Sequence, residues 1–242
     1  MKLKVIACNV FFREICHAAA RTPHTLELEF IELGEHSRPN RLRRKLQDAI
    51  DRTDEVDAIV LAYGLCGRST DGLTARDIPL VLPRSHDCCG ILLGSRKRFE
   101  EIFSPMPSTP FSSTGYIERG NYYFSDGEMM LGDNYEALIE TYGEEDAKYI
   151  YEAMHPKLDG ELQPIHFIDI PGIPSEEAKA KCRAKADEEK RPYKEIPGSL
   201  DLIEKLLFAD WNPEEFLTVP PGASVRMVGD WNEIIRLAPP EK

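Results

Sequence analysis

Short apolar runs alternate with charged segments of helical period along the first half of the chain. Residues 2–8, 26–33, 56–63 and 78–83 each predict a β-strand. The third run is almost entirely apolar, as in a central parallel strand, whereas the second alternates with acidic residues, which suits an edge strand. Residues 41–52 place apolar side chains at every fourth position and predict an amphipathic helix. This alternation predicts an α/β fold with a mainly parallel sheet and helices on both faces.

Two further helices are predicted in the first half. Asn9 follows the first apolar run, where its side chain can cap a helix that extends to about Ala20. A second helical stretch covers residues 88–103. Gly94 and Ser95 interrupt it, and the helix is expected to break or to be capped again there.

Residues 104–132 are rich in Pro, Ser, Thr, Gly and aromatic side chains, and the stretch is too long for an ordinary loop. We expect a lid, a hairpin or an insertion over the first half. The 242 residues therefore form a single α/β domain, or two βα halves, 1–103 and 133–242, joined by this insertion. In the second half we expect helices at 134–142, 144–154, 175–190 and 199–211, and strands at 165–170 and 216–219.

Composition excludes several classes of protein. The chain has 30 Lys and Arg against 42 Asp and Glu, a formal charge of −12, which argues against a nucleic-acid binder. No run approaches the roughly 18 apolar residues of a membrane span. The apolar N-terminal stretch is too short for a signal peptide, since Arg13 and Glu14 follow at once. We therefore expect a cytoplasmic protein with no nucleic-acid or membrane partner.

Three of the predicted strands lead into a cysteine. Cys8 ends the first strand, Cys66 follows the third and Cys88 follows the fourth. A single buried cysteine is usually a small packing residue. The carboxyl ends of parallel strands, however, share one edge of the sheet, where open α/β folds bind ligands. Three thiolates, with His86 as fourth ligand, suit zinc, and three protein ligands alone would leave a position open for water or substrate.

Polar residues beside these cysteines are candidates for the remaining chemistry. His86 is a metal ligand or a proton-handling group, and Asp87 would orient it, because a carboxylate often fixes a histidine tautomer. Arg68 and Arg84 flank the same strand ends and would bind an anionic part of a small-molecule substrate. Ion pairs with the nearby Asp71 or with Asp87 are equally compatible with the positions of these arginines.

The loop after the third strand carries two glycines, Gly64 and Gly67, on either side of Cys66. Their spacing matches neither a P-loop nor a dinucleotide-binding pattern, so nucleotide binding has no motif support. We expect the loop to line the cofactor position through Tyr63, Gly64, Gly67 and Ser69.

The segments AYGLCGRSTDGL, residues 62–73, and LPRSHDCCGILLGS, residues 82–95, resemble an uncharacterised family of bacterial and archaeal proteins, domain of unknown function 1638. The stretch FLTVPPG at 216–222 is similar to the same family, so the resemblance covers most of the chain. Cys89 departs from the family pattern. Ten other positions agree with the family pattern: Tyr63, Gly64, Cys66, Gly67, Arg84, His86, Asp87, Cys88, Gly94 and Ser95.

Members of this family are often encoded beside corrinoid-dependent methyltransferases and corrinoid proteins. The resemblance therefore implies a corrinoid protein as partner, with the corrinoid carried by that partner. In zinc-dependent methyltransferases a thiolate-rich zinc site binds an acceptor thiol and lowers its pKa. We accordingly expect a zinc-dependent enzyme of corrinoid-linked methyl or one-carbon metabolism.

Two alternatives remain open. The first is a non-enzymatic accessory protein that binds a metal or a corrinoid for a methyltransferase system, although the sequence lacks an Asp-x-His-x-x-Gly pattern, because His86 is followed by Asp-Cys-Cys. The second is a thiol-based oxidoreductase that uses the adjacent Cys88 and Cys89. An aromatic insertion on an acidic chain is also compatible with a homo-oligomer.

Overall fold

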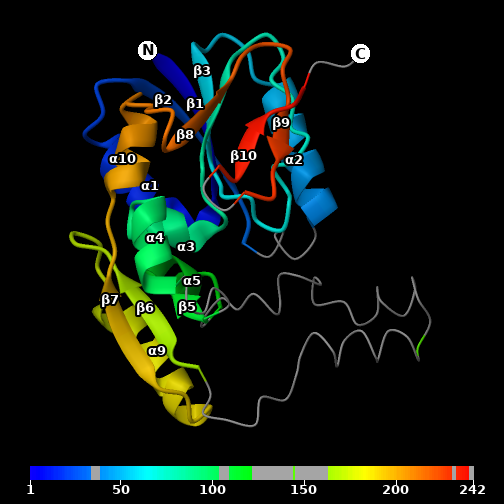
Figure 1. Ribbon diagram of the computed structural model, residues 1–242. Helices are drawn as coiled ribbons and strands as arrows, with labels where there is room; N and C mark the ends of the chain where they lie inside the picture. Colours follow the sequence, from blue (N-terminus) through cyan, green and yellow to red (C-terminus); the bar gives the residue numbers. More distant parts are fainter. Residues whose placement is uncertain (34–38, 104–108, 122–143, 145–162, 231–232, 240–242) are drawn as a thin grey trace.

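The computed structural model, shown in Figure 1, describes residues 1–33, 39–103, 109–121, 144, 163–230 and 233–239. The predicted helix at 134–142 and, apart from Glu144, the one at 144–154 lie outside these residues. Among the helices of the described ranges, none has the length and apolar character that a membrane crossing requires.

A five-stranded sheet, built mainly from the first half of the chain, has the order β2-β1-β3-β4-β8. The first four strands are parallel, and β8 pairs antiparallel with β4. The expectations for individual strands hold, since β2 lies at an edge and β3 is central and buried at every position. The strands are β1 (Lys2–Cys8), β2 (Thr25–Ile31), β3 (Ala58–Ala62), β4 (Leu80–Pro83) and β8 (Phe216–Val219).

Helices cover both faces of this sheet. The chain moves from β1 to β2 through α1 (Phe12–Ala19) and then back across β1 to β3 through α2 (Pro39–Asp51). Right-handed crossovers in opposite directions place the two helices on opposite faces, as Figure 1 shows. A later helix, α10 (Asp201–Leu207), packs beside α1 against β3 and β4. The reversal of direction at β1 makes the carboxyl ends of β1 and β3 the expected position of a ligand site.

A second, three-stranded parallel sheet has the order β5-β6-β7. β5 (Phe111–Ser112) and the following α5 (Thr114–Glu118) fall inside the stretch predicted to be a lid, hairpin or insertion. The described part of that stretch, 109–121, instead contributes a strand to the second sheet, because Phe111 pairs with His166. The other strands of this sheet are β6 (Ile165–Asp169) and β7 (Tyr193–Pro197). The helix α9 (Glu176–Glu188) connects these two strands and packs against them.

Local sequence determines the helix ends near the first strand and after the fourth. Asn9 does not cap a helix as predicted. It begins the 3-10 turn η1 (Asn9–Phe11), and α1 starts after that turn. The predicted interruption at Gly94 is present, since Gly94 has a φ of 82° and ends α3 (Cys88–Leu93) before α4 (Arg96–Phe103) begins.

The chain after β8 returns along the main sheet as a two-stranded antiparallel hairpin, β9 (Val225–Met227) and β10 (Ile235–Leu237). The hairpin was not predicted. Thr74 bridges to Ser224 just before it, so the hairpin is tied to the segment that joins β3 to β4.

Candidate functional site

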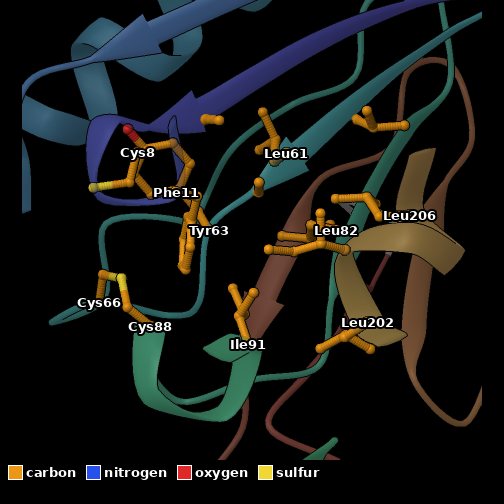
Figure 2. Packing of buried hydrophobic residues seen from close by; sticks show 14 of the residues in the cluster. Cys8, Phe11, Leu61, Tyr63, Cys66, Leu82, Cys88, Ile91, Leu202 and Leu206 are labelled. Carbon is orange, nitrogen blue, oxygen red and sulfur yellow. The ribbon is translucent and has the colours of Figure 1, made fainter. Parts of the chain in front are cut away.

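Three cysteines lie together at the carboxyl edge of the main sheet, near Tyr63 (Figure 2): Cys8 ends β1, and Cys66 and Cys88 follow β3 and β4. The Cys88 thiol is in hydrogen-bond contact with both Cys8 and Cys66. Cys8 is 5% exposed, Cys66 3% and Cys88 8%, so the group is almost closed to solvent. We call these three residues the cysteine cluster.

Backbone pairing between two loops brings Cys66 to Cys88. The amide of Leu65 donates to the carbonyl of Ser85 at 2.8 Å, and the amide of Cys66 donates to the carbonyl of His86 at 3.0 Å. Gly64 allows this approach, because a Cβ at that position would lie 2.7 Å from backbone atoms of Asp87. The loops after β3 and β4 therefore continue side by side beyond the sheet.

The loop that carries Cys66, residues Leu65 to Ser69, is held in an uncommon backbone conformation. Cys66, Gly67 and Arg68 have φ values of 42°, 62° and 72°. Only glycine adopts such left-handed angles readily, and other residues keep them where surrounding contacts compensate the strain. We call this segment the Cys66 loop. Strain of this kind is concentrated at binding and catalytic sites.

The surroundings of Cys8 and Cys88 shift their pKa values in opposite directions. The hydrogen bond from Cys88 lowers the pKa of the Cys8 thiol despite its burial, with help from the backbone N–H of Val10 and the charge of Arg119. Hydrogen bonding to Cys66 and Cys8, together with burial, raises the pKa of Cys88 well above its usual value. Cys8 is therefore the cluster member that ionises before Cys88, and Cys88 stays protonated as the donor between its neighbours.

The second sheet contributes Tyr116 to this site. A Cβ at Gly115 would lie 1.8 Å from the carbonyl oxygen of Val10, so α5 packs directly on the turn that follows Cys8. Tyr116 is 2% exposed, and burial together with the nearby Cys88 and Cys8 charges raises its pKa well above the usual value. From the sequence, Tyr116 is compatible with a cover over a flat ligand or with packing on the core, and the structure buries it beside the cysteine cluster. The run of small residues before it, which permits close packing, is the local signal for its position.

The side chain of Asp87 makes a structural contact at the start of α3. It is the N-cap residue of α3, and its carboxylate accepts hydrogen bonds from the amides of Cys89 at 2.8 Å and Gly90 at 3.2 Å. Asp87 thus fixes the start of the helix whose first residue is Cys88. The half-buried ring of His86 packs against Phe99, with ring centroids 6.1 Å apart.

Within the described ranges, no three His, Cys, Asp or Glu side chains are arranged as a ready-made metal-holding group. Two of the residues expected to line the cofactor position, Tyr63 and Ser69, are buried just before the Cys66 loop and at its end. Ser69 is fully buried, and its hydroxyl and amide both donate to the carbonyl of Leu65. Tyr63, at the end of β3, is 2% exposed.

The two arginines differ in what they contact. Arg68 forms an ion pair with Asp71, with 2.9 Å between Nη2 and Oδ2, and its side chain is 61% exposed. Arg84 donates from Nε to the carbonyl of Pro213 at 2.9 Å, and from Nη1 to the carbonyls of Glu233, at 3.0 Å, and Ile235. Arg84 therefore joins the end of β4 to the C-terminal hairpin.

Replacing Arg84 by methionine is expected to lower the free energy of unfolding by about 2 kcal/mol, since hydrogen bonds from a charged donor to three backbone carbonyls are lost. Urea unfolding measures the change. Arg236→Met, on the exposed side of the same hairpin, is the matched control and should change stability by less than about 0.5 kcal/mol. Equal stability of the two variants would contradict the role of Arg84 in joining the end of β4 to the C-terminal hairpin.

The fold and the site define an α/β protein with a buried three-cysteine cluster at the carboxyl edge of a mainly parallel sheet. The model of the family described as protein of unknown function (DUF1638) matches residues 30–207, and the chain belongs to this family. The match includes Cys66, Cys88 and Tyr116, whereas Cys8 precedes it. No curated protein and no solved structure matches the chain.

Proposed function

We propose that the protein is a zinc-dependent enzyme of corrinoid-linked methyl or one-carbon metabolism, with zinc bound by Cys8, Cys66 and Cys88. The observation that carries the proposal is the contact of three buried cysteines at the point where the strand order reverses. Open parallel sheets bind ligands at that point, and soft thiolates favour zinc.

The cysteine cluster fits zinc in the chemistry of its sulfur donors, although the three side chains are not arranged as a ready-made metal-holding group. Binding as three thiolates requires every thiol of the cluster that carries a proton to release it, and the three side chains to turn toward one position. The free energy of zinc binding at a structural thiolate site is large enough to offset such a change. Zinc held there would lower the pKa of a thiol acceptor or water at an open fourth position.

The chain's own residues would bind and orient the substrate around this position. Burial of the cluster and the cover of Tyr116 keep bulk water away from the thiolates. The exposed guanidinium of Arg68 is placed to bind an anionic part of the substrate, whereas Arg84 is committed to backbone carbonyls. His86 remains the candidate for a fourth ligand or a proton-handling group. A corrinoid protein as methyl donor is proposed from the family resemblance.

Elemental analysis of anaerobically purified, tag-free protein tests the proposal. We expect about one zinc per chain, and loss of zinc in the Cys8→Ser, Cys66→Ser and Cys88→Ser variants. Cys182→Ser is the matched control, because Cys182 is a fully buried cysteine that packs in the second sheet. Protein with reduced thiols and no metal, or variants that keep their zinc, would contradict the assignment.

Methyl transfer itself is tested with methylcobalamin and small thiols as acceptors. The absorbance of methylcobalamin should fall in the presence of the zinc-loaded protein and an acceptor, and should not fall with the Cys66→Ser variant. A protein that binds zinc but leaves methylcobalamin unchanged with every thiol acceptor would retain the metal site and contradict the proposed reaction.

A thiol-based oxidoreductase is the second candidate, and the lowered pKa of Cys8 beside the Cys88 thiol favours it. In that chemistry the Cys8 thiolate attacks a substrate disulfide and releases one thiol. Cys88 then displaces the second thiol and leaves a Cys8–Cys88 disulfide. This candidate predicts metal-free protein whose count of free thiols falls by two on mild oxidation, with loss of that change in Cys8→Ser.

A further inference from the structure

The geometry points to Arg43 as a positioning residue of the cysteine cluster: from α2 it holds the Cys66 loop in the left-handed conformation that keeps Cys66 against Cys88. The inference rests on the proposed function only in treating the cluster as the metal site. The conformation of the loop is a property of the chain itself and can be measured without metal.

The contact that carries the inference joins helix α2 to the strained part of the loop. Nη2 of Arg43 donates to the carbonyl oxygen of Arg68 at 2.7 Å, and Arg68 is the last of the three residues with positive φ. A short hydrogen bond from a guanidinium is among the stronger ones in proteins. It is therefore well placed to compensate the strain of the left-handed run.

Reaching the loop carries a cost for Arg43. The guanidinium Nε is buried and has no hydrogen-bond partner among the described residues. An unsatisfied buried donor is unfavourable, because its hydration is lost without replacement. The neighbouring side chain of Arg44, on the same turn of α2, is exposed, so the helix does not itself force an arginine at this turn to be buried. The partial burial of Arg43 is explained by the carbonyl that it binds.

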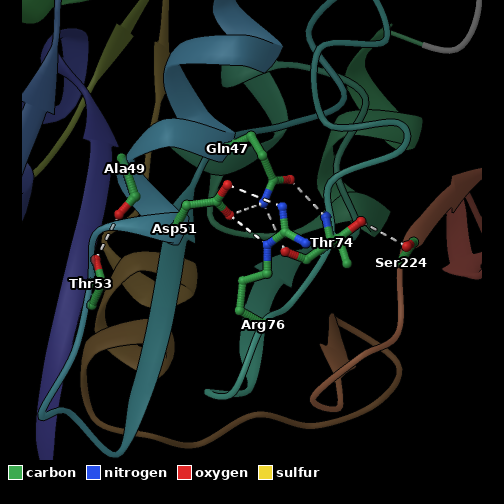
Figure 3. Close-up of polar contacts among 7 residues, drawn as sticks. All are labelled: Gln47, Ala49, Asp51, Thr53, Thr74, Arg76 and Ser224. Atoms are coloured by element: carbon green, nitrogen blue, oxygen red, sulfur yellow. Dashed lines mark hydrogen bonds and ion pairs between the residues drawn. The ribbon is translucent and has the colours of Figure 1, made fainter.

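The helix that carries Arg43, α2, is held in place by other polar contacts, which Figure 3 shows. The Gln47 side chain accepts from the amide of Thr74 at 2.9 Å and donates to its carbonyl at 3.0 Å. Asp51 pairs with Arg76 through 2.8 Å and 3.1 Å contacts. Thr74 and Arg76 follow the Cys66 loop in the chain, so α2 is attached to the segment on the far side of that loop.

A second set of contacts holds the same turn from its other end. The Arg68 side chain binds Asp71, and the other carboxylate oxygen of Asp71 accepts the amide of Met227 at 2.9 Å. The amide of Cys66, in turn, is bound to the carbonyl of His86. Arg43 thus joins the left-handed run to the helix, while the carbonyl of Arg68 also accepts the amide of Asp71 at 3.2 Å within the turn. Removing Arg43 takes away the bond to the helix and lowers the barrier for the run to relax toward ordinary negative φ values, while both ends stay attached.

The test measures alkylation of individual cysteines by iodoacetamide in metal-free, reduced protein, with the modified residues quantified by mass spectrometry. Arg43→Met should raise the rate at Cys66 about tenfold, because a hydrogen bond from a charged donor is worth roughly that factor in an equilibrium. The rate at Cys182 should stay within about twofold. Arg44→Met is the matched control and should leave both rates unchanged.

Two further variants separate positioning from general stability. Arg43→Lys retains one donor and should give a rate at Cys66 between wild type and Arg43→Met. Gly67→Ala places a side chain at a φ of 62° and should raise the Cys66 rate without any change in α2. If Arg43→Met does not fold, Arg43→Lys and Gly67→Ala decide the question. An unchanged Cys66 rate in folded variants overturns the positioning role.

Zinc affinity gives the second measurement, by competition with a chromophoric chelator. Arg43→Met should bind zinc about tenfold more weakly with unchanged stoichiometry, and Arg44→Met should bind as wild type does. Absence of zinc binding in wild type would contradict the proposed function and leave the alkylation result to decide the role of Arg43. Wild-type affinity in Arg43→Met would contradict the inference and leave the zinc site intact.

Discussion

Replacing Gly115 by alanine is expected to lower the free energy of unfolding by about 3 kcal/mol or more and to move Tyr116 away from the cysteine cluster. The added Cβ would lie 1.8 Å from the carbonyl oxygen of Val10 and 2.8 Å from its carbonyl carbon. Both are backbone atoms in the turn after β1, so no side-chain rotation relieves the overlap. Forced shifts in a packed region typically cost a few kcal/mol.

Urea unfolding measures the loss of stability in Gly115→Ala, and zinc content measures the effect on the site. Gly229→Ala is the matched control, since a Cβ at Gly229 meets nothing within 4 Å. It should change stability by less than about 0.5 kcal/mol. A loss below about 1 kcal/mol in Gly115→Ala would show that α5 is not packed on the turn after Cys8 as described.

Glu14→Gln is expected to stabilise the protein by about 3 kcal/mol at pH 8 and to change little at pH 4. Burial raises the pKa of Glu14 to about 7, and the charge of Glu118 adds to the effect against the opposing charges of Arg13 and Arg119. Glu14 is 1% exposed, and its Oε2 lacks a hydrogen-bond partner among the described residues. Ionisation of Glu14 in the folded protein is therefore unfavourable.

The sign of the pH dependence follows from linkage. The folded protein holds the Glu14 proton more tightly than the unfolded chain does, because the pKa of a glutamate carboxyl in the unfolded chain is the ordinary 4.5. The stabilisation is complete below about pH 4.5 and is lost as the pH rises through about 7. Each pKa unit corresponds to about 1.4 kcal/mol, which gives the expected 3 kcal/mol.

Urea unfolding between pH 4 and pH 8 measures this dependence. The wild-type curve should fall across that interval relative to the Glu14→Gln curve. Glu100→Gln, an exposed carboxylate on α4, is the control and should run parallel to wild type. Parallel curves for wild type and Glu14→Gln would contradict the assignment of a buried, protonated carboxyl at this position.

The main sheet could be predicted because its pattern is local. The fully apolar β3 and the alternating β2 each show their burial in a few consecutive residues. The second sheet could not be predicted in the same way. β5 has only two residues, and β7 contains Lys194 and Glu195, so the strands are defined by pairing with β6 and not by their own composition.

The candidate site likewise has features that local sequence predicts and features that depend on residues far away in the chain. The meeting of Cys8, Cys66 and Cys88 follows from strand ends, which are visible in the sequence. The role of Arg84 depends on carbonyls more than 120 residues away in sequence, as the separation of 129 for Pro213 shows, and no local pattern contains it. Asp87 is different, since an aspartate directly before a helix is a common cap and the sequence alone could have indicated it.

The order of the cysteines along the chain has a consequence during synthesis. All three members of the cluster, and the four parallel strands that support them, precede residue 89. The elements that cover or complete this half, α5, α10 and β8, come later in the chain. The thiols therefore leave the ribosome before their cover is made, and a metal ion or an oxidant in the cell would meet them first in the nascent chain.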